Sequence, residues 1–243
     1  MLELKDIYWS TPDGTPILNG LNLTIPDGKL VVVTGPNGGG KTTLAKIIAG
    51  IEKPAAGKIL LDGEDITELG VTERANKGVS FAFQQPVRFK GITVRRLIEL
   101  AANRKLPESE ICNSLSRVGL CARDYIDREV NATLSGGEIK RIEIATVLAR
   151  HTNLSVFDEP EAGIDLWSFT NLIQVFEKIR HDMHGTMMII SHQERILKIA
   201  DEIAVVAEGT IKSKGPAEEV MGDLLKGHEM RQSCSKQEEM FNE

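Results

Sequence analysis

The feature that most constrains this chain is the stretch GPNGGGKT at residues 35–42. The apolar run LVVV at 30–33 precedes it, and TTLAKIIAGI, with helical spacing of its apolar residues, follows it. A buried strand, a glycine-rich turn and a helix in this order match the GxxxxGK[ST] phosphate-binding loop. Glycines let backbone N–H groups point at phosphate oxygens, and the helix N-terminus adds partial positive charge. The stretch therefore predicts a nucleotide site in an α/β protein.

Two side chains of this loop have separate predicted tasks. Lys41 is expected to neutralise the β- and γ-phosphates, and the Thr42 hydroxyl to ligate Mg²⁺. The alternative is a glycine-rich turn with a chance lysine, which the flanking strand and helix disfavour. The predicted nucleotide-binding residues are Gly35, Asn37, Gly38, Gly39, Gly40, Lys41, Thr42 and Thr43.

Two carboxylates end a second buried strand, LSVFDE at 154–159. Asp158 is placed to hold Mg²⁺, directly or through water, and Glu159 to polarise an attacking water. Acidic pairs at strand ends are common, so this pair alone is a weak signal. Following a phosphate loop, it is the expected metal-and-base half of an ATPase that uses ATP and Mg²⁺.

A second anion site is predicted where LSGGE at 134–138 opens a long helical stretch. A serine and two glycines at a helix N-terminus leave N–H groups free for phosphate oxygens. One nucleotide cannot readily use both sites within one subunit, because separate lobes carry them. We therefore predict an ATP-dependent homodimer in which Ser135, Gly136 and Gly137 of one copy close over the nucleotide bound by the other.

Strand and helix patterns alternate along the chain, which implies a mostly parallel sheet with right-handed crossovers. Residues 1–33 contain short strands and Pro-Asp-Gly turns, KGVSFAFQQP reads as a strand ending at Gln84 and Gln85, and a helical block over 91–134 opens behind Thr93 as N-cap. The predicted fold class is α/β: a P-loop ATPase core with a mostly parallel sheet, an N-terminal antiparallel β-lobe and an inserted α-helical lobe. The predicted boundaries are 1–84 with 135–222 for the core, 85–134 for the helical lobe and 223–243 for a polar tail.

Composition limits the classes of partner. The 243 residues carry a formal net charge of −6, which disfavours non-specific binding to nucleic acid or anionic membranes. The N-terminus lacks the pattern of a secretory signal, and the longest apolar runs are too short to span a bilayer. Cys112, Cys121 and Cys234 lack metal-site spacing, which favours reduced thiols. We expect a cytoplasmic protein with no nucleic-acid partner and no direct membrane insertion.

The motifs at 35–42, 134–138 and 154–159, taken in their order along the chain, resemble those of the nucleotide-binding subunits of ABC ATPases. GPNGGGKTT resembles the Walker A loop, LSGGE the signature and FDE the end of Walker B, and the resemblance covers about residues 1–215. It adds Gln84 as the Q-loop glutamine, Asp165 as the D-loop aspartate and His192 as the H-loop histidine. The resemblance implies that His192 contacts the γ-phosphate and orients Glu159 and the water. It also implies that Gln84 senses Mg²⁺ and links the helical lobe to the core, and that Asp165 acts with the opposing copy.

The same resemblance leaves one expected residue open. The aromatic ring that stacks on adenine in this family should fall near Thr11. Tyr8 and Trp9 are neighbouring candidates, but strand alternation allows either ring to point into the core. Adenine stacking is therefore unassigned.

Three stretches resemble one class within this family, the SufC ATPases of SUF iron–sulfur cluster assembly. They are FAFQQPVRFKGITV, SGGEIKRIEIA, where transporter subunits more often carry SGGQ-x-QR, and ISHQERILKIADEIAVVAEGTIKSKG. This resemblance implies docking on a SufB- or SufD-like scaffold through about residues 84–130. Pro160 departs from the SufC pattern and agrees with transporter ATPases. The alternative is an ATP-binding subunit of a membrane ABC transporter (an importer), docked on a permease through the same surface.

Overall fold

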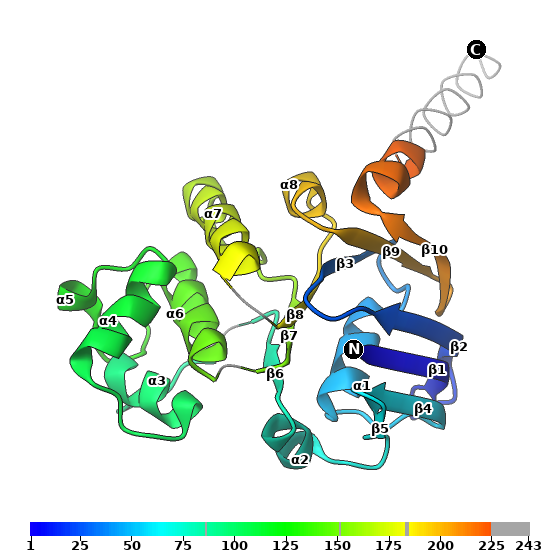
Figure 1. Cartoon of the computed structure of the whole chain (residues 1–243), viewed down its shortest axis with the longest axis horizontal. Helices are drawn as coiled ribbons and strands as arrows, with labels where there is room; N and C mark the ends of the chain where they lie inside the picture. The colour runs from blue at the N-terminus through cyan, green and yellow to red at the C-terminus, as the bar shows by residue number, and fades with distance from the viewer. Residues whose placement is uncertain (86, 151, 183–184, 225–243) are drawn as a thin grey trace.

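The computed structural model describes residues 1–85, 87–150, 152–182 and 185–224, and two sheets form its framework (Figure 1). The larger sheet has the strand order β10-β9-β3-β8-β7-β6, and the smaller has the order β2-β1-β4-β5. The strands are β1 (Leu2–Ser10), β2 (Pro16–Ile25), β3 (Leu30–Thr34), β4 (Ala56–Leu61), β5 (Glu64–Asp65), β6 (Val79–Ala82), β7 (Leu154–Asp158), β8 (Thr186–Ile190), β9 (Glu202–Ala207) and β10 (Thr210–Pro216).

The larger sheet is parallel apart from one edge. β3 pairs with β8 and β9, and β7 pairs with β6 and β8, all in parallel, whereas β10 forms an antiparallel hairpin with β9. Every residue of β3, β7 and β8 is buried, as expected for strands covered on both faces. The carboxyl ends of these three strands meet at one edge of the sheet, which is where α/β proteins bind ligands. The predicted mostly parallel sheet is confirmed.

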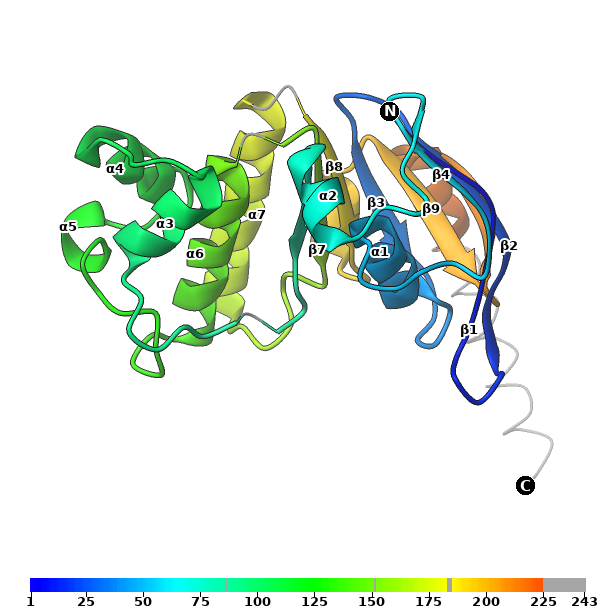
Figure 2. The same ribbon diagram turned by 90° about the horizontal axis from the view of Figure 1, so that it is seen from below.

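Helices occupy both ends of the molecule. Figures 1 and 2 show α3, α4, α5 and α6 grouped at one end, whereas α1 lies with the smaller sheet at the other. Thr93 is the N-cap of α3 as predicted, since its hydroxyl accepts the Arg96 N–H at 3.3 Å. Among the described residues, no helix has both the length and the apolar character needed to cross a membrane. The helices are α1 (Lys41–Ala49), α2 (Val71–Asn76), α3 (Val94–Ala102), α4 (Glu108–Arg117), α5 (Ala122–Tyr125), α6 (Gly136–Ala149), α7 (Leu166–Asp182) and α8 (Glu194–Lys198), and residues 217–224 are also helical.

The core consists of two buried clusters, one on each side of the larger sheet. Side chains alternate across β3, so Leu30 and Val32 join one cluster and Val31 and Val33 the other. The first cluster continues into α3, α4, α6 and α7, and the second into α1 and the antiparallel sheet. The α/β class with its antiparallel lobe and helical lobe is therefore confirmed.

One predicted strand end is wrong. β6 stops at Ala82, whose partner on β7 is Phe157, rather than at Gln84 and Gln85. The N–H of the next residue, Phe83, donates instead to the Glu143 carboxylate on α6, at 3.0 Å. The sheet ladder ends because a side chain from another element takes this donor.

The predicted domain boundaries stay predictions, and the predicted tail lies outside the described residues from 225 onward.

Candidate active site

The loop between β3 and α1 has the backbone that a phosphate cradle needs. Gly35, Gly38 and Gly40 have φ of 137°, 78° and 102°, in the left-handed region where glycine alone is unstrained. A Cβ at Gly35 would overlap the carbonyl oxygen of Val206, and a Cβ at Gly40 would lie 2.6 Å from a methyl carbon of Leu18. At both positions the packing of the sheet and the backbone conformation require glycine.

Lys41 is the first residue of α1, and its side chain turns back over the loop. Its Nζ donates to the carbonyl oxygens of Gly35 and Pro36, each at 2.9 Å. Lys41 is only 6% exposed, so these two bonds offset part of the cost of burying the cation. No side chain caps the start of α1, which leaves its first N–H groups available. A buried ammonium group and free amides at one place form an anion site.

The remaining loop residues surround this anion site. Asn37 and Gly38 are exposed, whereas Gly39 is buried and donates its N–H to the Pro36 carbonyl at 3.2 Å. Thr43 lies half-buried in the first turn of α1. The predicted nucleotide-binding residues therefore lie on one continuous segment from the end of β3 to the start of α1, in which Gly39, Gly40 and Lys41 are buried.

Thr42 and Asp158 meet where β7 ends beside α1. The Thr42 hydroxyl donates to Asp158 Oδ1 at 3.2 Å. Burial raises the pKa of Asp158, which is 2% exposed, and the Thr42 hydrogen bond opposes this rise. A nearby cation would favour the ionised carboxylate. A hydroxyl and a carboxylate oxygen suit Mg²⁺, which proteins hold through one or two carboxylates together with phosphates and water, so the residues present fit this ion.

Glu159 has a conformation that is unusual for a residue other than glycine. Its φ is 41°, and such backbone strain persists only where the surroundings enforce it. Its N–H donates to the Ile190 carbonyl at the end of β8 (3.0 Å), and its carbonyl accepts the Ala162 N–H (2.9 Å). Its Oε2 accepts the side-chain amide of Gln84 at 2.6 Å. The half-buried Glu159 is thus held in place by the sheet and by the loop that follows β6 at residues 83–85, called the Gln84 loop below.

Gln84, predicted to sense Mg²⁺, and His192, predicted to orient Glu159 and the water, are placed differently. Gln84 contacts Glu159 through its Nε2, which leaves its amide oxygen as the atom able to accept or to ligate. His192 is exposed, and its Nε2 lies 3.3 Å from Gln193 Nε2. Within the described residues, no hydrogen bond joins His192 to Glu159. The predicted role of His192 therefore stays a prediction.

Glu161 lies beside this site, although the sequence pattern does not single it out. Its carboxylate accepts the Ser191 hydroxyl, and burial raises its pKa, with the bond from Ser191 and the nearby His192 opposing the rise. Its second oxygen, Oε2, is buried without a hydrogen-bond partner in the described structure. In the sequence, Glu161 is the third acidic residue of FDEPEAG. The local pattern alone does not distinguish a buried carboxylate from a solvent-exposed one at this position.

The second predicted anion site lies at the start of α6. The Ser135 hydroxyl accepts the Glu138 N–H at 3.2 Å, and the Glu138 carboxylate accepts the Ser135 N–H at 2.6 Å. These reciprocal bonds form a capping box. The N–H groups of Gly136 and Gly137, in the first turn, have no intrahelical acceptor. The helix therefore starts where the sequence pattern predicted, and the capping box is a further feature that the structure adds.

Asp165 lies beside this helix start in the same chain. Its Oδ1 accepts the N–H groups of Trp167 and Ser168, each at 3.0 Å, and the bond from Ser168 contributes most to lowering its pKa. A Cβ on Gly137 would overlap the Ser168 hydroxyl, and a Cβ on Gly136 would lie 3.1 Å from the Gly163 carbonyl oxygen. The four residues predicted to act on an opposing copy thus lie close together, with Gly137 buried and the other three exposed. They are Ser135, Gly136, Gly137 and Asp165.

The phosphate loop and this second site lie apart. Figures 1 and 2 show α1 and α6 in different parts of the molecule, with the larger sheet between them. A cavity of about 580 Å³, lined by Gln84, Arg88, Gly136, Lys140 and Gly163 among others, separates the Gln84 loop from the start of α6. The two predicted anion sites of one chain are therefore separate, as the predicted sharing of a nucleotide between two copies requires.

The aromatic candidates for adenine stacking differ in exposure. Trp9 packs against the buried cluster under the antiparallel sheet, whereas Tyr8 is 48% exposed. Thr11 closes the turn between β1 and β2, since its hydroxyl accepts the Thr15 N–H at 3.1 Å. Tyr8 is thus the accessible ring of the two, and the stacking residue stays unassigned.

Comparisons with known proteins agree with this geometry. A family model described as ABC transporter matches residues 18–162. An uncharacterized ABC transporter ATP-binding protein of Methanocaldococcus jannaschii is 37% identical, over 93% of this chain and 92% of that protein. The structure of cbiO1 from Clostridium perfringens, part of the ABC transporter complex cbiONQ, is 29% identical with a TM-score of 0.76, over 91% of this chain and 90% of that chain. An ATP-binding cassette solved as a dimer with ADP and phosphate has a TM-score of 0.79 at 22% identity, over 89% of this chain and 99% of that chain.

Proposed function

The chain belongs to the ABC transporter ATPase family and hydrolyses ATP, and on this premise we propose that it is the ATP-binding subunit of a membrane transporter. The names of its relatives refer to transporter ATP-binding proteins and to a transporter complex. They favour a permease as partner over the SufB- or SufD-like scaffold that the SufC resemblance implied. The observation that supports the ATPase chemistry most strongly is the meeting of Thr42, Asp158, Glu159 and Gln84 beside the phosphate loop.

In the proposed reaction, each residue has a binding or positioning task. The loop amides and Lys41 hold the phosphates, with Lys41 exchanging its bonds to loop carbonyls for phosphate oxygens. Thr42 and Asp158 would hold Mg²⁺, which neutralises phosphate charge when bound. Glu159 accepts a hydrogen bond from the attacking water and orients it towards the γ-phosphate. The rate enhancement comes from positioning and charge stabilisation, without a covalent intermediate.

A second copy of the chain would complete the site. The phosphate loop and the start of α6 are in different parts of the molecule, so the free amides of Gly136 and Gly137 need a nucleotide from elsewhere. A head-to-tail dimer supplies this nucleotide twice, once to each copy. The similarity in fold to a cassette that was solved as a dimer supports this arrangement. Closure of the dimer would move the helical lobes and whatever is docked on them.

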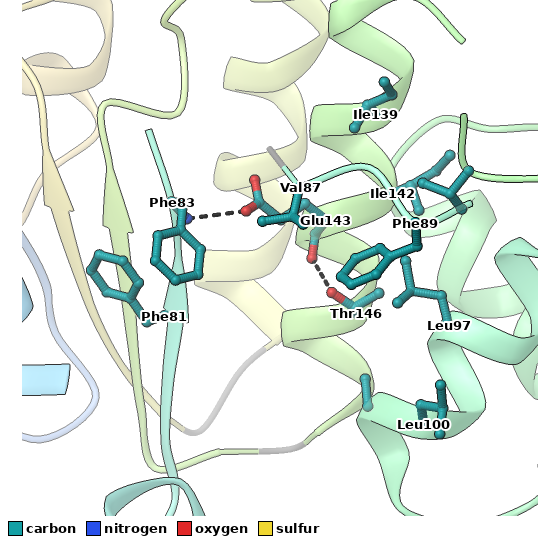
Figure 3. A pocket seen from close by; sticks show the side chains of 12 residues that line it. Phe81, Phe83, Val87, Phe89, Leu97, Leu100, Ile139, Ile142, Glu143 and Thr146 are labelled. Atoms are coloured by element: carbon teal, nitrogen blue, oxygen red, sulfur yellow. Dashed lines mark hydrogen bonds between the residues drawn. The ribbon is translucent and has the colours of Figure 1, made fainter. Parts of the chain in front are cut away.

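The proposed docking surface is an apolar cavity between the end of β6 and the helices α3 and α6 (Figure 3). Its volume is about 370 Å³, and among its lining side chains Phe83, Val87 and Leu100 are 43%, 47% and 50% exposed. Large apolar side chains exposed around a cavity mark an interaction site. Among the described residues that line it, only Glu143 is charged. We infer that a short amphipathic helix of the permease inserts its apolar face here.

A SufB- or SufD-like scaffold is the second candidate partner. The observation that favours it is the stretch SGGEIKRIEIA, whose Lys140 and Glu143 contact the Gln84 loop, together with QERIL after His192. Both candidates would use the same ATPase site, so catalytic residues do not separate them.

The chemistry of the captured partner distinguishes the two candidates. The full chain carrying Glu159→Gln, expressed with a tag in its native cells, would be purified with ATP and detergent and analysed by mass spectrometry. The transporter proposal predicts a polytopic membrane protein in stoichiometric amount. A soluble, β-rich partner recovered without detergent would contradict it and support the scaffold.

A further inference from the structure

Lys140 is a buried cation on α6 that contacts the loop carrying Gln84. It is 1% exposed, although lysine is rarely buried without a specific partner. Its Nζ donates to the Phe83 carbonyl, to the Gln84 carbonyl at 3.3 Å and to Glu143 Oε2 at 2.9 Å. All three donor positions of the ammonium group are therefore used, and two of them hold main-chain atoms of one loop.

Glu143 holds the same loop as a hydrogen-bond acceptor, whereas Lys140 holds it as a donor. Its Oε1 accepts the Phe83 N–H at 3.0 Å, as Figure 3 shows, and its Oε2 accepts Lys140. The loop begins where β6 stops pairing with β7, at Ala82, so the sheet no longer fixes it. Both polar groups of the Phe83 main chain are thus held by one ion pair on α6, while its ring packs on Phe81.

The residue held in this way touches the catalytic carboxylate. Gln84 donates its side-chain amide to Glu159 Oε2 at 2.6 Å, and its own carbonyl accepts Lys140. A shift of the loop relative to α6 would therefore move the amide that positions Glu159. A displacement of about 1 Å at a reacting group can lower a rate about 100-fold.

We propose that Lys140 and Glu143 are positioning residues for ATP hydrolysis: the pair fixes the Gln84 loop on α6 so that Gln84 holds Glu159 in its reactive place. Neither residue belongs to the phosphate loop or to the Thr42–Asp158 pair. The pair also connects two parts of the site along a single helix, because α6 carries the second anion site at its start and Lys140 in its second turn. This role rests on the ATPase activity of the family and needs neither the dimer nor the partner.

The test removes both charges together. Removing one partner would leave an unpaired buried charge, whereas replacing both by apolar residues of similar volume is often neutral for stability. The double variant Lys140→Met with Glu143→Leu in the full chain also loses the bonds to the Phe83 and Gln84 main chain, so it should melt below the wild type but remain folded at the assay temperature. Its kcat for ATP should fall about 10- to 100-fold while its KM changes less than about threefold, because the phosphate loop is untouched.

Matched variants separate positioning from general damage. Lys140→Arg keeps a long donor side chain and should recover most of the lost kcat. The control pair is Lys214 and Glu202, 2.5 Å apart at the amino-terminal end of β9, the edge of the sheet opposite the site. Lys214→Met with Glu202→Leu should leave kcat unchanged.

Two results would overturn the proposal. One is wild-type kcat in the folded double variant. The other is equal loss of kcat in the double variant, in Lys140→Arg and in the control pair. If the Met–Leu variant does not fold, Lys140→Gln with Glu143→Gln takes its place, since it keeps polar partners for Phe83 but shortens the link to Gln84. A folded Gln–Gln variant with wild-type kcat would overturn the proposal equally.

Discussion

The residue type at individual positions of this site is determined by backbone conformation and by the atoms packed against it. Gly35 has a positive φ, and the Val206 carbonyl of β9 occupies the place of its missing Cβ. Gly38 has a positive φ as well, but open space surrounds it. Gly35 is thus required by both its backbone conformation and its packing, whereas Gly38 is required by its backbone conformation alone.

This difference predicts unequal effects of alanine. Gly38→Ala should lower the free energy of unfolding by about 1–2 kcal/mol through the left-handed backbone alone. Gly35→Ala should cost more than this and should also weaken ATP binding, because the loop must move away from β9. Chemical denaturation and nucleotide titration of the two variants measure both effects. Equal losses in the two variants would contradict the account.

His192→Ala tests the predicted histidine at the same scale. The ring is exposed and packs into no core cluster, so its removal should leave the melting temperature within about 2 °C of the wild type. If His192 orients the water with Glu159, kcat should fall at least about 100-fold, with ATP affinity changed much less. Unchanged turnover would make His192 a loop residue without a role in hydrolysis.

Among the elements, α6 combines several tasks. Its capping box orders its first turn, its apolar side packs on α3 and α4, and Lys140 with Glu143 holds the Gln84 loop. The same capped first turn presents the free amides of Gly136 and Gly137. Stability and function can be separated here by choosing the cap residue.

Substitutions of Ser135 provide that separation. Asp and Asn cap helices about as well as Ser, whereas Ala costs about 1 kcal/mol. Ser135→Asp should therefore keep the free energy of unfolding but repel the triphosphate of the opposing copy, so that ATP no longer promotes dimers. Ser135→Asn is the neutral control and should still dimerise. Denaturation and light scattering report the two properties, and normal ATP-dependent dimers of Ser135→Asp would contradict the predicted contact.

The elements also show what the sequence could predict. The phosphate loop, the carboxylates at the end of β7 and the start of α6 each depend on neighbours within a few residues, so local patterns located them. The end of β6 depends on Glu143, sixty positions beyond Phe83 in the chain. Glu161 depends on Ser191, thirty positions away. These features follow from tertiary contacts, which periodicity and motif spacing do not encode.

At the scale of the whole molecule, an exposed apolar surface adjoins the predicted dimer contact. Leu166 and Trp167, at the start of α7 beside Asp165, are 69% and 82% exposed. Exposed aromatic side chains next to a predicted contact are candidates for burial on association. The chain has only one other tryptophan, Trp9, which makes Trp167 usable as a fluorescent reporter.

Trp167 emission should report closure of two copies. In a Trp9→Phe, Glu159→Gln background, ATP with Mg²⁺ should shift the emission of Trp167 to shorter wavelength, and the shift should grow with protein concentration. ADP should produce a smaller change. A shift independent of protein concentration would indicate a change within one chain rather than association.

The central claim is that Glu159 drives hydrolysis of ATP shared between two copies of this chain. It is tested most directly by incubating Glu159→Gln with ATP and Mg²⁺ and measuring bound nucleotide and mass by light scattering coupled to gel filtration. The account predicts intact ATP, turnover reduced at least about 100-fold, and a particle with twice the mass of one chain. Hydrolysis at the wild-type rate, or a monomer that retains ATP, would contradict it.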